Sequence, residues 1–343
     1  MNYNVSKMSM NNQNSDLQNS VENIMKNLHY ESYDEWVKNF ALNLPNIWNE
    51  KSATKLKPDI SPENFSGINS SIVIGRGPSL KKNKHLELLS NSDYDGSIVC
   101  SDGALTSVLE SGITPDKFKK FYVVTIDPYP YAKKFYDAEI VRKYGQKING
   151  IFTVIANPDT VNYARQAGID VHWVHSLFDY HEGKKSFNQI SASMIRVKNH
   201  TDGLPALQTG GNVGTSSWFI SWKILLCNVV ALIGINHSWE EDDPWEKIIT
   251  HGINLDPERK HKLVNMDKHS ASFEKLFKKV YNPEFDCNCI VDPIFQFYSS
   301  ALKEFISRSP PHIKTINATE GGVIFGDRII CLKFKNFLQE YHC

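Results

Sequence analysis

Short runs of apolar, β-branched residues recur along the chain from residue 70 onward, and each ends in a polar turn. Such runs are typical of buried strands, and helical stretches follow several of them. Strands that alternate with helices predict an α/β fold, here a Rossmann-like, mostly parallel sheet with helices on both faces. The predicted strands are Ser71–Ile74, Ser97–Cys100, Phe121–Ile126, Ile151–Ile155, Val171–Val174, Val229–Ile233 and Lys314–Ile316.

The residues before this pattern differ in character. Met1–Ser20 is rich in Asn, Ser and Gln and has little to bury, so we expect a disordered tail. Val21–Glu50 carries apolar residues at helical spacing and predicts two short helices, and Lys51–Asn69 predicts a polar connector. The expected organisation is a tail over 1–20, a helical lead-in over 21–69 and an α/β domain over 70–343 with a C-terminal helical extension.

Composition and charge narrow the class of protein. Hydrophobic residues make up 41% and charged residues 22%, which is typical of a globular protein with a core. Lys+Arg and Asp+Glu both number 38, so no overall basic field favours a nucleic acid partner. No apolar run is long enough to span a bilayer, and no apolar leader opens the chain.

The six cysteines form no paired C-x-x-C motifs, so a structural zinc site is not expected. Cys287-Asn288-Cys289 is the one close pair, and we predict free thiols in a loop. The unpaired cysteines, together with the absence of a leader, predict a cytoplasmic protein with reduced thiols.

The segment Ser71–Leu80 combines a strand, a glycine turn and a helix start. Gly75 and Gly77 allow close approach to the backbone, and Pro78 lacks the N–H that the first turn of a helix leaves unbonded. Outward-pointing N–H groups in such a turn would bind a phosphate, although an ordinary strand-to-helix turn has the same residues. Leu80 stands where a dinucleotide fingerprint requires a third glycine, and no P-loop motif occurs.

A second glycine-rich stretch, Thr209–Ser217, contains Gly210, Gly211 and Asn212 and precedes the apolar helix predicted over Trp218–Cys227. Thr215, Ser216 or Ser217 could cap that helix. Its N–H groups could bind a second phosphate or a base, and the alternative is a flexible loop before a core helix.

Charged and polar side chains follow several predicted strands. In an open parallel sheet, ligands bind beyond the carboxyl ends of the strands. The residues at such ends are Arg76, Asp102, Asp127, His237 and Glu320.

Three of these residues suggest specific chemistry. Asp127 could hold Mg²⁺ on the phosphates of a nucleotide, or form an Asx-turn before Pro128. Asp102 allows the same two interpretations. His237 could act as a general base or donate to a phosphate, or have a structural role.

Six segments in order resemble the MptE-like family, which takes its name from the archaeal 6-hydroxymethyl-7,8-dihydropterin pyrophosphokinase. They are IVIGRGPSL, CSDGAL, VVTIDPYP, TGGNVGTSSW, ALIGIN and INATEGG, and the resemblance covers about residues 40–340. The same domain is similar to the core of the Maf motility-associated glycosyltransferases, which modify flagellin with nonulosonic acids. More distantly, it resembles bacterial sialyltransferases that use CMP-sialic acid.

The resemblance implies a domain that binds a nucleotide donor. This chain differs from the family at Arg76, because the family often has a small residue at that position. The residues that match the family's donor-phosphate turn, its second strand end and the segment near the nucleotide are Gly75, Gly77, Pro78, Ser79, Ser101, Asp102, Gly210, Gly211 and Asn212.

For function, the resemblance implies a transferase, and the first candidate is diphosphoryl transfer from ATP to a pterin alcohol with Mg²⁺. Arg76 and the glycine turn would hold phosphates, Asp127 would bind the metal, and His237 would serve as acid/base or phosphate contact. The alternative is a glycosyltransferase that uses a CMP-activated nonulosonic sugar, with His237 as the base for the acceptor hydroxyl. A third possibility is a non-catalytic nucleotide-binding protein.

Overall fold

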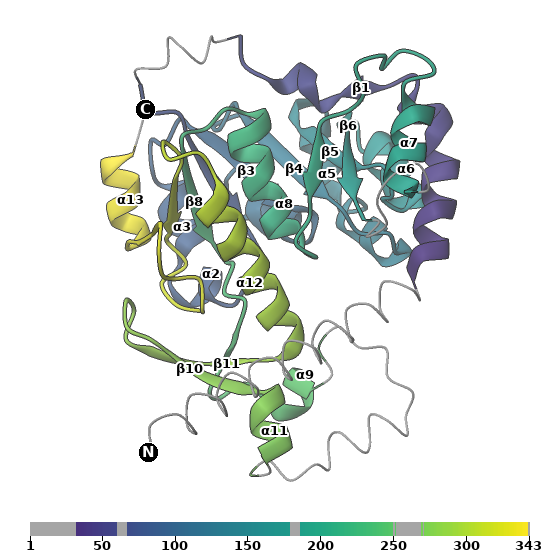
Figure 1. Ribbon diagram of the computed structural model, residues 1–343. Coiled ribbons are helices and arrows are strands. Elements are labelled where there is room, and N and C mark those ends of the chain that lie inside the picture. Colours follow the sequence, from purple (N-terminus) through teal and green to yellow (C-terminus); the bar gives the residue numbers. More distant parts are fainter. Residues whose placement is uncertain are drawn as a thin grey trace.

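The computed structural model describes residues 32–59, 67–178, 186–249 and 271–341, together with His251 and His269. Within these residues, ten strands form one sheet, and every pairing in it is parallel. The order is β1-β6-β5-β4-β3-β2-β8-β12-β13, and β7 pairs with β6 (Figure 1). The bounds are β1 Lys51–Ser52, β2 Ser70–Ile74, β3 Ser97–Ser101, β4 Phe121–Thr125, β5 Asn149–Thr153, β6 Asp170–Leu177, β7 Ala206–Gln208, β8 Val229–Ile233, β12 Lys314–Asn317 and β13 Ile329–Cys331.

The predicted parallel α/β sheet is therefore confirmed. All seven predicted strands are present, and β8 has the predicted bounds. The prediction for β5 was displaced by two residues, because the apolar run continues past Thr153 into a buried segment that does not pair as strand. The apolar residues after Thr153 are therefore explained by burial and not by strand pairing.

The two faces of the sheet bury different side chains of each strand, as the two-residue repeat of a strand requires. In β2, Ile72 and Ile74 enter one core cluster and Val73 enters the other. The first face is covered by helices that include residues 32–47, α4 and α6, and the second by α8 and α12, which lie in front of the sheet in Figure 1. Helices on both faces match the prediction.

Most helices are short. None of those in the described residues has the length and apolarity needed to cross a bilayer. The helices are residues 32–47, α2 Ser79–Lys82, α3 His85–Ser90, α4 Leu105–Glu110, α5 Glu139–Tyr144, α6 Pro158–Gln166, α7 Phe187–Ile195, α8 Val213–Phe219 with a π-helical continuation Ile220–Ile224, α9 Trp245–Ile249, α11 Ala271–Leu276, α12 Pro293–Arg308 and α13 Phe334–Glu340.

The helical lead-in is present as the helix over residues 32–47. The first of the two helices predicted there, and the tail Met1–Ser20, lie outside the described residues. The prediction that Lys51–Asn69 is only a connector was wrong in part, because β1 pairs with β6 and a 3₁₀ turn follows at Ala53–Leu56.

A second, antiparallel sheet joins β9 Trp239–Glu240, β11 Cys287–Val291 and β10 Lys278–Asn282. It lies with α9 and α11 at the bottom of Figure 1. Cys287 and Cys289 belong to strand β11, so the loop predicted for them was wrong. They form no disulfide bond, and neither do the other cysteines among the described residues.

Candidate functional site

A cavity of about 530 Å³ opens at the carboxyl ends of β2, β3, β4 and β8. Its walls come from the turns after these strands, the start of α8, and α12. The structure thus brings together segments far apart in sequence, as the parallel topology predicts. The sequence-predicted residues that line it are Gly75, Arg76, Gly77, Pro78, Ser101, Asp102, Asp127, Asn212 and His237.

The glycine turn is held tightly against the turn after β8. Gly75 N donates to Ile233 O at 2.9 Å, and Gly77 N donates to Gly234 O at 2.7 Å. These two amides are therefore bonded within the protein and are not available to a phosphate. The glycines are needed for close approach instead, since a Cβ at Gly75 would lie 2.4 Å from Gly234 O.

Ser79 supports the turn from behind and does not belong to the cavity lining. Its side chain is buried, and its Oγ donates to Asn236 Oδ1 at 3.0 Å. Asn236 follows β8 and lines the cavity. This bond fixes the two turns relative to each other, and α2 beyond it has only four residues.

The second glycine segment positions Asn212 at the cavity. Gly210 and Gly211 have positive φ, and a Cβ at Gly211 would meet Tyr298 of α12 at 2.6 Å, so both residues serve the packing of the loop. Asn212, not one of the three predicted hydroxyl residues, caps α8: its Oδ1 accepts from Thr215 N at 2.9 Å. The helix begins at Val213, earlier than predicted.

Asp102 is buried at the end of β3. Its Oδ1 accepts from Gly103 N at 2.7 Å, and its Oδ2 accepts from Thr125 Oγ1 at 2.9 Å. Burial raises the pKa of Asp102 to about 7, although these two bonds and the Arg76 guanidinium act in the opposite direction. The carboxyl group therefore changes charge near neutral pH.

Asp127 lies half-buried at the end of β4. Its Oδ1 accepts from Tyr129 N at 2.9 Å, which is the predicted Asx-turn, and its Oδ2 accepts from Tyr131 Oη. Burial raises its pKa above the usual range. The charge of Asp127 also raises the pKa of Asp102.

Arg76 is the exposed cation of the glycine turn. Its Cζ lies 5.7 Å from the centre of the Phe135 ring, and a Cβ built on Gly103 would lie 3.2 Å from its Cδ. The side chain thus extends across the cavity toward the end of β3. Among the described residues, the hydroxyl of Ser101 there is buried and has no partner.

His237 is buried after β8 with a φ of 47°. Its ring stacks on Phe295 at 6.2 Å and lies 5.9 Å from Tyr298. Burial lowers its pKa to about 3, so the ring is neutral at physiological pH. Its Nδ1 is buried and has no partner among the described residues.

Sequence reasoning missed a second histidine. His251 lines the cavity, and its Nδ1 lies 2.8 Å from Oδ2 of Asp292, the buried N-cap of α12. Trp239 Nε1 donates to the same oxygen at 2.6 Å. Asp292-Pro293 signals a helix start in the sequence, but nothing there connects it with His251.

Glu320 was expected at the same edge but lies outside the cavity lining. It has a φ of 58°, and its Oε1 accepts from Phe334 N at 3.0 Å and lies 3.2 Å from His85 Nε2. Glu320 therefore stabilises the start of α13 and does not face the cavity.

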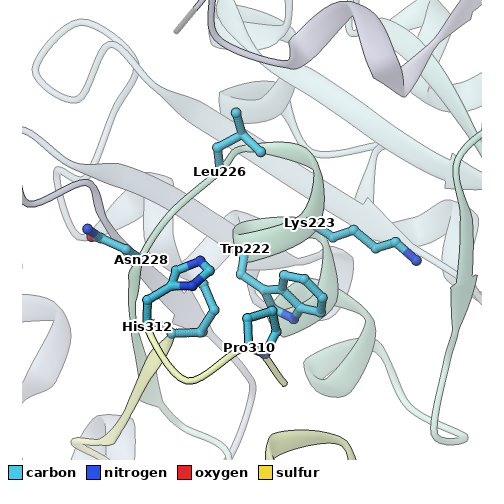
Figure 2. A pocket seen from close by; sticks show the side chains of 7 residues that line it. Trp222, Lys223, Leu226, Asn228, Pro310 and His312 are labelled. Atoms are coloured by element: carbon cyan, nitrogen blue, oxygen red, sulfur yellow. The ribbon is translucent and has the colours of Figure 1, made fainter. Parts of the chain in front are cut away.

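A second cavity, of about 400 Å³, lies at the opposite edge of the sheet, before β8 and β12 (Figure 2). Trp222, Pro310 and His312 form its walls, and Lys223 extends away from them. Asn228 there already donates to Gly67 O at 2.9 Å. Ligands of open parallel sheets bind at the other edge, so the first cavity is the candidate site.

Comparisons with known proteins identify a family and a similar fold. Residues 38–242, more than half of the chain, match the family described as 6-hydroxymethylpterin diphosphokinase MptE-like. No curated protein matches the chain. The fold is similar to that of the Maf glycosyltransferase from Magnetospirillum magneticum AMB-1, with a TM-score of 0.50 and 15% identity. The match covers 85% of this chain but 39% of that protein.

Proposed function

Because the chain belongs to the MptE-like family, we propose that it is a transferase that takes its donor group from a nucleotide bound in the large cavity. One observation carries this proposal: the turns after β2, β3, β4 and β8 converge with the start of α8 on a single cavity. That cavity holds an exposed guanidinium, three carboxyl groups and aromatic rings, which suit the phosphates, the metal and the base of a nucleotide.

In this proposal Arg76 contacts the donor phosphate, because its guanidinium is exposed in the cavity and can form paired bonds to phosphate oxygens. The hydroxyl of Ser101 is a second candidate contact, since it is buried without a partner among the described residues. The rings of Phe295 and Tyr298 offer faces for a planar base.

The family description makes diphosphoryl transfer from ATP to a pterin alcohol the first candidate reaction. That reaction would use Mg²⁺, which proteins commonly hold with one or two carboxylates together with phosphate oxygens. Asp127 and Asp102 fit this requirement, because both face the cavity and their charges interact. Mg²⁺ would neutralise the charge of the phosphates during transfer.

The alternative is glycosyl transfer from a CMP-activated nonulosonic sugar. A specific observation favours it: His251, Phe295 and Tyr298 line the cavity although they lie outside the family match at residues 38–242. The similarity to the Maf glycosyltransferase extends over 85% of the chain and so includes part of this added region. A CMP-sugar also carries one phosphate, which suits a cavity where Arg76 and Lys247 are the cations among the described lining residues.

The test begins with a binding screen by calorimetry with CMP, AMP and ATP–Mg²⁺. Turnover then separates the reactions: release of AMP from ATP in the presence of the reduced pterin supports the first, and release of CMP from the activated sugar supports the second. Neither product should appear when the acceptor is left out. Nucleotide binding with no turnover of either donor would instead indicate the non-catalytic alternative.

A further inference from the structure

We propose that His251 is the general base of the transfer reaction and that Asp292 is the residue that positions it. The inference rests on the proposed function, and it assigns the role to a different histidine from the one that the sequence suggests. His251 reaches the cavity from one side, and Asp292 lies behind it at the N-terminus of α12.

The bonds around Asp292 fix its orientation. Oδ1 accepts from Phe295 N at 2.8 Å, which is the helix cap, while Oδ2 accepts from Trp239 Nε1 at 2.6 Å and lies 2.8 Å from His251 Nδ1. The Asp292 side chain is 3% exposed and that of His251 is 26% exposed. An ionised carboxylate in this place accepts the proton of Nδ1–H, so the lone pair of the neutral ring is on Nε2.

Ring packing holds the imidazole in place. His251 lies 4.3 Å from the Phe295 ring and meets Trp239 edge-on at 5.1 Å. The ring is thus fixed by one hydrogen bond and two aromatic contacts while part of it reaches solvent. A general base requires this combination of fixed orientation and access to the acceptor.

His237 is less suited to the same role. It is buried, and the elements packed against it offer two aromatic rings but no carboxylate hydrogen-bonded to its ring nitrogens in the described residues. Its protonated form would lack a stabilising partner. His251 has that partner, because the carboxylate of Asp292 stabilises the imidazolium that proton transfer creates.

Nε2 of His251 accepts the proton of the acceptor hydroxyl as the acceptor oxygen bonds to the transferred group. The bond between that group and the donor phosphate oxygen breaks, and its electron pair leaves with the nucleotide. The imidazolium then releases its proton to water. The same step serves a phosphorus or an anomeric carbon centre.

Other charged groups near the pair of His251 and Asp292 come from α9 and α12. Lys247 lies 3.1 Å from Asp243 and its Nζ is 4.9 Å from the Trp239 ring, so this cation is already paired. His237 is neutral, and Lys303 of α12 acts on His237. Asp292 is therefore the carboxylate that contacts His251 among the described residues.

The first experiment needs no substrate. Long-range ¹H–¹⁵N NMR of the full chain, assigned with His251→Gln, should show the neutral His251 ring protonated at Nδ1. In Asp292→Asn the fraction of neutral His251 rings protonated at Nδ1 should fall, because the charged acceptor of that proton is lost. Asparagine also caps helices well, so this variant keeps the start of α12. A proton on Nε2 in the unaltered protein, or an unchanged tautomer population in Asp292→Asn, would overturn the proposed pairing of His251 with Asp292.

The second experiment measures turnover with the donor found above. His251→Gln should lower turnover by about 10²- to 10⁴-fold and leave the Kd for the donor nearly unchanged. Asp292→Asn should also lower turnover, and it should likewise leave the Kd for the donor nearly unchanged. His312→Gln in the second cavity is the matched control and should keep full activity. Turnover that survives His251→Gln would overturn this inference alone, whereas absence of turnover in the unaltered protein would overturn the proposed function with it.

Discussion

The amide of Gly77 donates to the carbonyl of Gly234 across 2.7 Å, and this bond joins the turn after β2 to the turn after β8. The same approach leaves no room for a side chain. A Cβ at Gly77 would lie 2.2 Å from Asn236 Oδ1 and 2.7 Å from Gly234 O. The glycine is therefore explained by contact between two turns of the protein.

Gly77→Ala should destabilise the fold by about 1–3 kcal/mol, as overpacking of a tight contact does, and should abolish nucleotide binding by moving the turn. Gly67→Ala is the matched control, because a Cβ there meets nothing within 4 Å. Urea unfolding and calorimetry measure the two effects. Normal stability and normal affinity in Gly77→Ala would contradict this account of the turn.

Arg76→Ala should weaken nucleotide binding about tenfold or more and leave stability within about 0.5 kcal/mol. The reason is that the side chain is exposed and its charge faces the cavity. Arg76→Lys should recover part of the affinity, because lysine keeps the charge but loses the paired bonds. Arg142→Ala, which removes an exposed arginine paired with Asp137, should not change affinity.

Asp102→Asn should stabilise the protein relative to the unaltered chain as pH rises. The pKa of Asp102 is raised to about 7 in the folded state, so between about pH 4 and pH 7 only the unfolded chain loses this proton. The unaltered protein therefore loses stability over that range, and the variant does not. We expect a relative gain of at least about 1 kcal/mol from pH 5 to pH 8.

Asp116→Asn provides the comparison for Asp102. The hydrogen bond from Lys147 lowers the pKa of this exposed carboxylate, so the unaltered protein gains stability as pH rises through about 4, and Asp116→Asn should lack that gain. Denaturant unfolding at four pH values would measure both variants. If the free energy of unfolding depended on pH in the same way in Asp102→Asn and in the unaltered protein, the carboxyl group of Asp102 would not be buried.

His237→Asn should reduce the loss of stability in acid. Burial lowers the folded pKa of His237 to about 3, so below about pH 6.5 the unfolded chain takes up a proton that the folded ring does not. Removing the ring should improve stability at pH 5, relative to pH 8, by roughly 1–2 kcal/mol. Asparagine also tolerates the positive φ at this position. The exposed His312 is the control, and an equal effect of His312→Asn would rule out this explanation.

Much of the fold could be predicted because a parallel sheet buries whole strands. Val229–Ile233 is apolar throughout, buried on both faces and bounded by polar turns, so its limits were readable. Thr153–Ala156 shows why boundaries fail: the residues are buried against other elements, but backbone pairing ends at Thr153. Hydropathy cannot distinguish these two causes of burial.

Residues of the candidate site could be predicted only where they follow the end of a strand. Asp102, Asp127 and His237 meet at one cavity because parallel strands end at one edge. Glu320 also follows a strand, yet its left-handed backbone directs it to the amide of Phe334. His251 and Asp292 could not be found in this way, because their contact joins segments that belong to no common strand pattern.

The position of β2 between β3 and β8 also determines when the site is complete during synthesis. β2 to β5 pair in chain order as they emerge, but Gly75 and Gly77 bond to Ile233 and Gly234, about 160 residues later. At roughly 5–20 residues per second, the ribosome needs on the order of ten seconds or more to supply that partner. The glycine turn therefore lacks its partners until β8 has been made, and nascent chains stopped before β8 lack the site however well their first strands have folded.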